Sequence, residues 1–178
     1  MFSYDPYAEL QSLRPVEPFA VTSTDFTDGQ ELPRVAWGAS AGGEDRSPQL
    51  AWGGFPEATR SFAVTCFDPD APTASGWWHW AVANIPADVS SLPADAGAAG
   101  GAGLPHGALA LPNEARLAQY SGPTPPARTG VHRYVFVVHA LDVERLDLDG
   151  DATPAQLGFH AFFHALGRAG ITGTASGD

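Results

Sequence analysis

Two short segments combine ionisable side chains with residues that constrain the backbone. They are Asp68-Pro69-Asp70-Ala71-Pro72 and Gly130-Val131-His132-Arg133-Tyr134. Proline fixes φ and lacks an N–H donor, whereas glycine also reaches positive φ. Side chains on such turns are held in fixed directions, which a small-molecule site requires. A third segment, Trp77-Trp78-His79-Trp80, lies between these two. Together they supply a carboxylate, two histidines and an aromatic wall. This combination predicts a compact pocket for a small polar or anionic ligand.

Each of these polar groups also has a purely structural interpretation. Asp and Pro are common in turns, so Asp68 and Asp70 can be solvated turn residues. A histidine on a strand rich in tryptophan, such as His79, is commonly a buried residue that only satisfies its hydrogen bonds. Tyr134 lies two residues after His132, and on a strand both side chains face the same side. The phenol of Tyr134 can therefore donate to a bound oxyanion, or simply pack in the core.

The sequence gives little support for a metal centre or a catalytic nucleophile. His160 and His164 share a helix face, but Ala161 stands where a metalloprotease motif has glutamate, and no third ligand is evident. The acidic run at 147–151 lacks the closing glutamate of a calcium loop. There is no Gly-x-Ser-x-Gly elbow, Walker loop or dinucleotide fingerprint. We therefore expect no metal and no cofactor, and we expect binding rather than catalysis.

The composition is typical of one acidic globular domain. The chain has 178 residues, 44% of them hydrophobic, and a net charge of −11, so its field repels nucleic acid and anionic membranes. Cys66 is the single cysteine, and its apolar neighbours predict a buried side chain. The N-terminus has no signal-peptide pattern, and no apolar stretch approaches the ~20 residues that span a bilayer. These features predict a cytoplasmic protein without stable membrane insertion.

Alternating hydrophobicity predicts a mainly β fold. Residues 61–67 alternate between two faces that are both mostly apolar, which is typical of a central strand in a sandwich. Residues 133–141 carry the strongest strand signal. Further strands are expected at 19–23, 49–52, 77–85 and near 107–111. The Gly-, Ala- and Pro-rich stretch between Pro86 and Gly130 is too long for one plain loop.

One helix is clearly marked near the C-terminus. Thr153 suits the N-cap, Pro154 suits the first turn, and Gln156 completes a capping box. Apolar residues follow at helical spacing, and Gly170 is expected to end the helix. Residues 1–18 hold three prolines and little periodicity, which predicts an N-terminal arm ahead of a single domain at 19–178. Strands followed by a late helix predict an antiparallel β-sandwich with peripheral short helices.

An ordered set of segments gives the chain a family resemblance. The segments are Ser47-Pro48-Gln49-Leu50-Ala51-Trp52, Phe67 through Pro72, Trp78-His79-Trp80 leading to Asn84, Gly122-Pro123-Thr124-Pro125-Pro126, and His132-Arg133-Tyr134, with Ala140-Leu141-Asp142 closing the next strand. In this order they resemble the phosphatidylethanolamine-binding protein (PEBP) family, in its bacterial YbhB/YbcL (Raf-kinase-inhibitor-like) branch. The resemblance covers about residues 19–174. It implies two antiparallel sheets with Greek-key connections and helical decoration near the C-terminus.

The resemblance also implies how the two constrained segments meet. Asp68 matches the family's pocket carboxylate, and His79 and His132 match its two pocket histidines. Asp70 is then free to form an ion pair with Arg133, which would tie the segments together as structural support. Asp68 would orient one imidazole and fix its tautomer. The Ala71-Pro72 peptide has only the ordinary ~5% frequency of the cis form for an X–Pro bond.

The implied pocket suits a small anion. Protonated histidines donate charge-assisted hydrogen bonds to phosphate oxygens. Tyr134 adds a hydroxyl, Pro72, Trp78 and Pro126 form the rim, and Gly122 and Gly130 offer backbone N–H groups to an anion. Because no arginine is aimed at this site, we expect weak affinity for phosphate alone.

Some features depart from the family pattern. Ala175 stands where an aromatic residue is expected near the pocket mouth, and the long C-terminal helix of eukaryotic relatives is absent. The kinase-inhibitor role of those relatives is therefore not carried over. A homodimer is expected by resemblance to bacterial relatives, with Tyr4, Tyr7 and Trp37 as candidate exposed aromatic residues.

These considerations lead to one main hypothesis and two rivals. The main hypothesis is a non-enzymatic protein that binds a small anion (phosphate, phosphoethanolamine or a carboxylate) and thereby modulates a protein partner. The first rival is an inhibitor of a serine protease or kinase that acts through its surface, with the pocket accessory. The second is a hydrolase that uses the histidines and Asp68.

Overall fold

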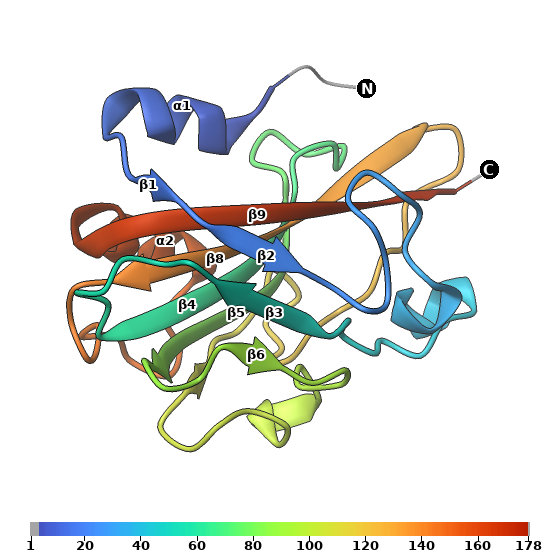
Figure 1. The fold of residues 1–178 in the computed structure, drawn as a ribbon. Helices are drawn as coiled ribbons and strands as arrows, with labels where there is room; N and C mark the ends of the chain where they lie inside the picture. The colour runs from blue at the N-terminus through green and yellow to red at the C-terminus, as the bar shows by residue number, and fades with distance from the viewer. Residues whose placement is uncertain (1–3, 178) are drawn as a thin grey trace.

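The computed structural model describes residues 4–177 as two β-sheets with two helices. In chain order the elements are α1 (Pro6–Leu13), β1 (Glu17–Pro18), β2 (Ala20–Thr22), β3 (Leu50–Gly53), β4 (Ser61–Asp68), β5 (Trp77–Pro86), β6 (Ser91–Leu92), β7 (Leu109–Ala110), β8 (Val131–Leu141), α2 (Pro154–His164) and β9 (Ala165–Ser176). Single 3-10 turns lie at Arg34–Ala36, Ala39–Ala41 and Ala99–Gly101. The larger sheet has the order β1-β9-β8-β4-β5-β7, and the smaller sheet, β2-β3-β6, lies across its inner face (Figure 1).

The predicted sandwich is confirmed, but it is not strictly antiparallel. Every strand pair of the larger sheet is antiparallel except the outermost one, in which β1 runs parallel to β9. In that pair Glu17 lies opposite Gly167 and Pro18 lies opposite Arg168. Proline lacks an N–H donor, so a two-residue edge strand is a position where Pro18 is tolerated.

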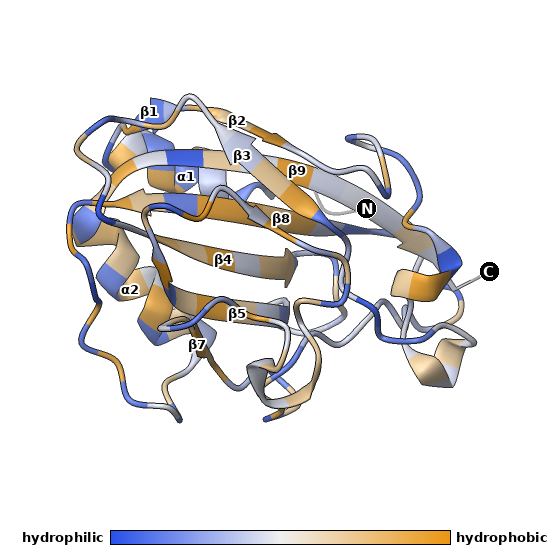
Figure 2. Ribbon diagram, turned by 60° about the horizontal axis from the view of Figure 1, so that its bottom comes forward, coloured by the Kyte–Doolittle hydropathy of each residue, from blue (hydrophilic) through white to orange (hydrophobic). Residues whose placement is uncertain are grey.

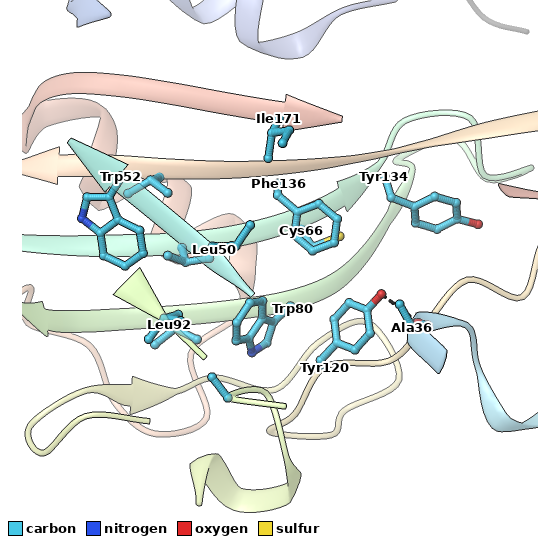
Figure 3. Packing of buried hydrophobic residues seen from close by; sticks show 14 of the residues in the cluster. Ala36, Leu50, Trp52, Cys66, Trp80, Leu92, Tyr120, Tyr134, Phe136 and Ile171 are labelled. Atoms are coloured by element: carbon cyan, nitrogen blue, oxygen red, sulfur yellow. Dashed lines mark hydrogen bonds between the residues drawn. The ribbon is translucent and has the colours of Figure 1, made fainter. Parts of the chain in front are cut away.

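The main core lies between the two sheets. Figure 2 shows hydrophobic residues along β4, β5 and β8, and all eight residues of β4 are buried, as the alternation on two apolar faces predicted. Large side chains from both sheets meet there, including Trp52, Trp80 and Phe136 (Figure 3). The Cys66 thiol is buried among them, as expected, and burial raises its pKa well above the ordinary value. This rigid inner layer fixes the ends of β4, β5 and β8.

The C-terminal helix begins as predicted and ends early. Thr153 and Gln156 form the expected capping box. The helix ends at His164 rather than at Gly170, because Ala165 starts the long strand β9. That strand pairs with β8 from Leu141 to Val131 and covers an edge that would otherwise stay unpaired. A strand so rich in Gly and Ala has weak intrinsic preference, so tertiary pairing decides its structure.

The N-terminal segment folds onto the outer face of the larger sheet. Residues 6–13 form α1, with the Asp5 carboxylate as N-cap. The Tyr7 hydroxyl lies 3.3 Å from the Thr65 hydroxyl of β4. Arg14 donates through Nη1 to the carbonyls of Phe162 and Ala165 at 2.7 and 2.8 Å. Two helices, α1 and α2, thus cover the side of the sheet that faces away from β2, β3 and β6.

The aromatic residues expected to form a dimer surface are not all exposed. Trp37 is buried, with 4% of its surface accessible, and its indole N–H donates to the Leu32 carbonyl. Tyr7 lies in α1 and is half-buried, whereas Tyr4 is exposed. The expectation for Trp37 is therefore wrong. Among residues 4–177, no helix is both long enough and apolar enough to cross a membrane.

Candidate functional site

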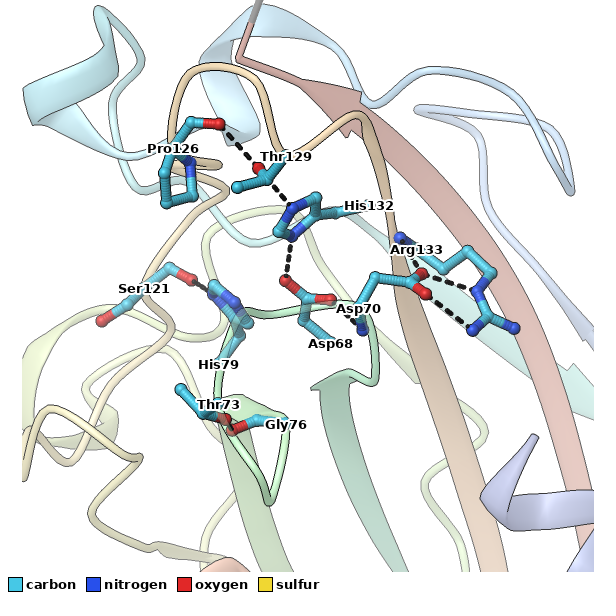
Figure 4. Close-up of polar contacts among 10 residues, drawn as sticks. All are labelled: Asp68, Asp70, Thr73, Gly76, His79, Ser121, Pro126, Thr129, His132 and Arg133. Atoms are coloured by element: carbon cyan, nitrogen blue, oxygen red, sulfur yellow. Dashed lines mark hydrogen bonds and ion pairs between the residues drawn. The ribbon is translucent and has the colours of Figure 1, made fainter. Parts of the chain in front are cut away.

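A cavity of about 340 Å³ opens where β4, β5 and β8 end, and we call it the site cavity. Its wall includes Asp68, Pro72, His79, Pro126, His132 and Tyr134. Three loops thus converge on one space, from the end of β4, from the segment that precedes β8, and from residues 121–126 (Figure 4). The structure brings together every ligand-contact residue predicted from the sequence except Trp78.

Trp78 lies on the opposite side of β5, so its predicted place on the rim is wrong. It packs against Phe67, with ring centroids 4.4 Å apart, and lines a different cavity. Trp77 supplies the indole of the site cavity instead. The cause is the alternation of side chains along a strand, because Trp77 and Trp78 point to opposite faces.

A β-bulge turns His79 toward the site cavity. Cys66 pairs with Trp80 and Phe67 pairs with Trp78, which leaves His79 without a partner on β4. An extra residue of this kind bends the strand and re-aims a side chain, and bulges are frequent beside functional sites. His79 and Trp80 are consequently both buried on the inner side, where Trp80 joins the core and His79 lines the site cavity.

Asp68 and His132 form a buried pair at the base of the cavity. The Nδ1–H of His132 donates to Asp68 Oδ2 at 2.8 Å, and the two side chains are only 1% and 3% exposed. The Nε2 atom of His132 lies 2.8 Å from the Thr129 hydroxyl, which donates to the Pro126 carbonyl at 2.6 Å. The Thr129 hydroxyl therefore lies between the ring of His132 and the Pro126 carbonyl and fixes the orientation of the ring.

Asp70 and Arg133 tie the two sequence segments together, as predicted. Arg133 donates to Asp70 through Nε at 2.6 Å, through Nη2 at 2.9 Å and through its backbone N–H at 3.0 Å. The Asp70 backbone N–H donates in turn to Asp68 Oδ1 at 2.8 Å. The hydrogen bonds that the Asp70 carboxylate accepts from the guanidinium raise the pKa of Arg133. The pair points away from the cavity and holds the Asp68 carboxylate in place (Figure 4).

His79 presents one ring nitrogen to the cavity. Its Nδ1–H donates to the Ser121 carbonyl at 2.6 Å, and because a carbonyl only accepts, this bond fixes the tautomer. Nε2 has no hydrogen-bond partner among residues 4–177. Burial lowers the pKa of His79, and the bond to Ser121 partly offsets this effect. The free imidazole is therefore neutral near pH 7 and carries a lone pair on Nε2.

Tyr134 lines the same cavity and packs against the His79 ring. Its ring lies edge-on to the His79 ring, with centroids 4.9 Å apart, and the residue is 1% exposed. Burial raises the pKa of Tyr134, so the phenol keeps its proton. No group within the described part of the chain accepts this proton. Tyr134 packs in the core, as one interpretation had it, and it also lines the cavity, so a hydrogen bond to a bound oxyanion stays a prediction.

The two glycines expected to offer N–H groups to a ligand differ from expectation, and only Gly122 lines the site cavity. The Gly122 N–H donates to Asp45 Oδ1 at 2.8 Å, so it is not directed at a ligand. Gly130 has a φ of 82°, which places the turn before β8 in the left-handed region. Pro125 and Pro126 form the opposite wall. The Ala71-Pro72 peptide is trans, as are all peptide bonds of the described chain.

Sequence reasoning missed several supporting residues. Asn113 donates through Nδ2 to the Ser121 hydroxyl at 2.7 Å and to the Gln119 carbonyl at 3.0 Å, which fixes the wall that holds His79. The Thr129 hydroxyl positions the ring of His132, and the Asp45 carboxylate positions the backbone of Gly122, each through a hydrogen bond. Thr129 lies three residues before His132 in a turn, and this spacing was the one signal available.

The remaining sequence candidates lie elsewhere. Ala175 pairs with His132 in the sheet and is fully buried, so β9 contributes no hydroxyl or aromatic ring at this point. His164 contacts Asp142 at 2.8 Å on the surface, far along the chain from the site cavity. Residues 4–177 contain no group of three or more His, Cys, Asp or Glu side chains that could hold a metal ion.

Comparisons with known proteins give the sequence and fold similarity of the chain. A family model described as phosphatidylethanolamine-binding protein matches residues 22–176. UPF0098 protein YbhB of Escherichia coli (strain K12) is 47% identical over 152 residues, which is 84% of this chain and 95% of that protein. UPF0098 protein YbcL of the same strain is 44% identical over 156 residues, 86% of this chain and 85% of that protein. The crystal structure of E. coli YbcL superposes with a TM-score of 0.86 and 41% identity, and covers 90% of this chain and 99% of that chain.

Proposed function

The chain belongs to the phosphatidylethanolamine-binding protein family, and from this premise we propose that it binds a small phosphoryl or carboxylate anion in the site cavity. Occupancy of the cavity would then modulate a protein partner. The observation that carries the proposal is that His79 and Tyr134 line one cavity, and neither His79 Nε2 nor the Tyr134 hydroxyl has a hydrogen-bond partner in residues 4–177. Buried polar groups are normally hydrogen-bonded, so two such groups in one cavity favour a polar ligand.

The charges around the cavity support an anion. Asp68 alone would repel one, but the Nδ1–H of His132 donates to its carboxylate at 2.8 Å and so occupies one of its oxygens. His79 can take up a proton when an anion approaches, and its Nε2–H then donates a charge-assisted hydrogen bond. Tyr134 donates a second hydrogen bond without a change of charge. An anion would thus meet one cationic and one neutral donor.

The size of the cavity favours a headgroup over a complete lipid. Small-molecule sites are typically about 300–1,000 Å³, and 340 Å³ lies at the small end of this range. The rim of Pro72, Pro125 and Pro126 is apolar and stiff, which suits a small substituent on the anion. Phosphate, phosphoethanolamine and acetate are therefore the probes of choice.

The proposal is tested by an NMR titration of the ¹⁵N-labelled protein with each of these three anions near pH 6.5. We expect saturable shifts that centre on His79, His132 and Tyr134. The variant His79→Gln should lose them, whereas His164→Gln, which changes an exposed histidine on α2, should bind like the wild type. An absence of shifts at millimolar concentration, or equal shifts in both variants, contradicts the proposal and favours a regulator that acts through its surface.

A further inference from the structure

A second and larger cavity, about 740 Å³, lies on the outer face of the larger sheet, and we call it the outer cavity. Its floor is formed by strand residues that include Phe67, Trp78, His139 and Arg168, and its sides by α1 and α2. Both helices cover this side of the sheet (Figure 1). Trp78 and His79 point to opposite faces of β5, so the outer cavity is separate from the site cavity.

The floor of the outer cavity carries a partly buried guanidinium, Arg168, that has no ion-pair partner within the described residues. Arg168 on β9 and His139 on β8 are paired in register, so their side chains are neighbours on the outer face. Within residues 4–177, Nε and Nη1 of Arg168 and Nδ1 of His139 are buried and have no hydrogen-bond partner. Such groups are costly to bury and are normally satisfied, so their presence needs an explanation.

Neighbouring groups do not supply the missing negative charge. Asp5 caps α1 and accepts from the N–H groups of Tyr7 and Ala8 at 3.0 and 3.1 Å. Asp28 accepts from the Thr172 N–H at 2.8 Å. The guanidinium of Arg14 lies near enough to lower the pKa of Arg168, and burial lowers it further. Burial lowers the pKa of His139 to about 3, so this imidazole is neutral and Arg168 holds the local charge.

The rest of the outer cavity is apolar. Phe67, Trp78 and Phe162 line it, and Leu10 and Pro6 close it from α1. Phe159 lies at the mouth, since it both lines the cavity and is 66% exposed. A cavity of 740 Å³ is in the upper part of the range of small-molecule sites. One positive end and a long apolar wall match a ligand with an anionic head and an alkyl tail.

We propose that the outer cavity binds a single-chain anionic amphiphile, with its carboxylate or phosphate head on Arg168 and His139 and its alkyl chain between α1, α2 and the sheet. The head would satisfy the unpartnered donors of Arg168 by charge-assisted hydrogen bonds. The proposal concerns other residues and a different face from the site cavity, so the two succeed or fail separately.

The test is isothermal titration of the full-length protein with dodecanoate and with dodecyl phosphate, which distinguish a fatty-acid head from a phosphate head. We expect saturable one-to-one binding of at least one of the two. Dodecanol, which lacks the charge, and acetate, which lacks the chain, should bind at least ten-fold more weakly. Equal binding of dodecanol would overturn the proposal, because the guanidinium of Arg168 would then play no part.

Variants separate the head site from the tail site. Arg168→Met should weaken binding at least ten-fold, while Arg60→Met, at an exposed arginine paired with Glu144, should leave it unchanged. Phe159→Ala, at the mouth of the cavity, should weaken binding several-fold. Phe163→Ala is its control, because Phe163 is 57% exposed on the same helix and lies outside the cavity lining. Unchanged binding in Arg168→Met or in Phe159→Ala contradicts the proposal.

A thermal melt without ligand provides a second readout that does not need binding. Arg168 is partly buried and has no ion-pair partner within residues 4–177, so removing its charge costs the fold little and Arg168→Met should melt close to or above the temperature of the wild type. Dodecanoate should raise the melting temperature of the wild type and leave that of Arg168→Met unchanged. A large loss of stability in Arg168→Met without ligand would assign Arg168 a structural role and overturn the proposal.

Discussion

The site cavity makes a prediction about pH, because His79 can donate to an anion from Nε2 only when it is protonated. The Ser121 carbonyl holds the proton on Nδ1, so the neutral imidazole offers a lone pair to the cavity. Burial lowers the pKa of His79 from its ordinary value near 6.5. Binding of an anion must therefore take up a proton above that pKa, and affinity must fall as the pH rises.

The magnitude follows from proton linkage. A change of one pH unit is worth about 1.4 kcal/mol for a site that binds only in the protonated state, which is a ten-fold change in affinity. We expect the dissociation constant of sulfate to rise about ten-fold from pH 6.5 to pH 7.5. Sulfate is the suitable probe because its own charge is constant over this range. Isothermal titration at several pH values measures the slope directly.

The variant His79→Gln identifies the group that titrates. Glutamine keeps an amide donor and has no charge to gain, so its sulfate affinity should be weak and nearly independent of pH. The other titratable groups that face the ring are Asp68, His132 and Asp45. If the pH dependence survives in His79→Gln, the titration belongs to one of those groups. A flat profile in the wild type would refute the reasoning altogether.

Other predictions concern the supports of the cavity. Arg133→Met should cost about 3–5 kcal/mol in urea unfolding, because Asp70 is only 3% exposed and would lose the guanidinium that contacts both of its carboxylate oxygens. Asp70→Asn should cost about 1–3 kcal/mol, since Arg133 is 23% exposed, and equal costs would contradict this. Tyr134→Phe should weaken sulfate binding about ten- to hundred-fold with little change in melting temperature, and unchanged affinity would exclude the hydroxyl as a donor. Gly122→Ala should cost about 1–3 kcal/mol, because its Cβ would collide with the backbone of residues 36–38, and an unchanged urea midpoint would show that this loop can move.

Local sequence patterns predicted the parts of the fold that local forces determine. The capping box at Thr153 and Gln156 formed because both of its hydrogen bonds lie within one helical turn. The strand at 61–67 followed from its apolar residues on two faces. The strand β9 was missed because Gly and Ala have weak strand preference, and only the open edge of β8 makes that segment extended.

Some features of the candidate site could likewise be predicted from local sequence, and others could not. The pair of Asp70 and Arg133 could be predicted because the two segments are constrained and oppositely charged. It could not be predicted that Trp77 rather than Trp78 lines the site cavity. That outcome depends on which side of β5 faces the core next to the bulge at His79. The outer cavity was missed for a related reason. Its walls come from α1 and α2, and the sequence indicated only an arm where α1 lies.

The two cavities share one wall, the loop that follows Asp68, and Thr73 lines both of them. A ligand in one cavity alters affinity in the other only if this loop has two arrangements that the ligands distinguish. The loop is held at Asp70 by the ion pair with Arg133 and at Thr73 by a 2.6 Å hydrogen bond to the Gly76 carbonyl. We therefore expect saturating dodecanoate to change the sulfate dissociation constant less than two-fold. A larger change, matched by an equal effect of sulfate on dodecanoate, would show that the loop moves and that the two faces of the sheet are coupled.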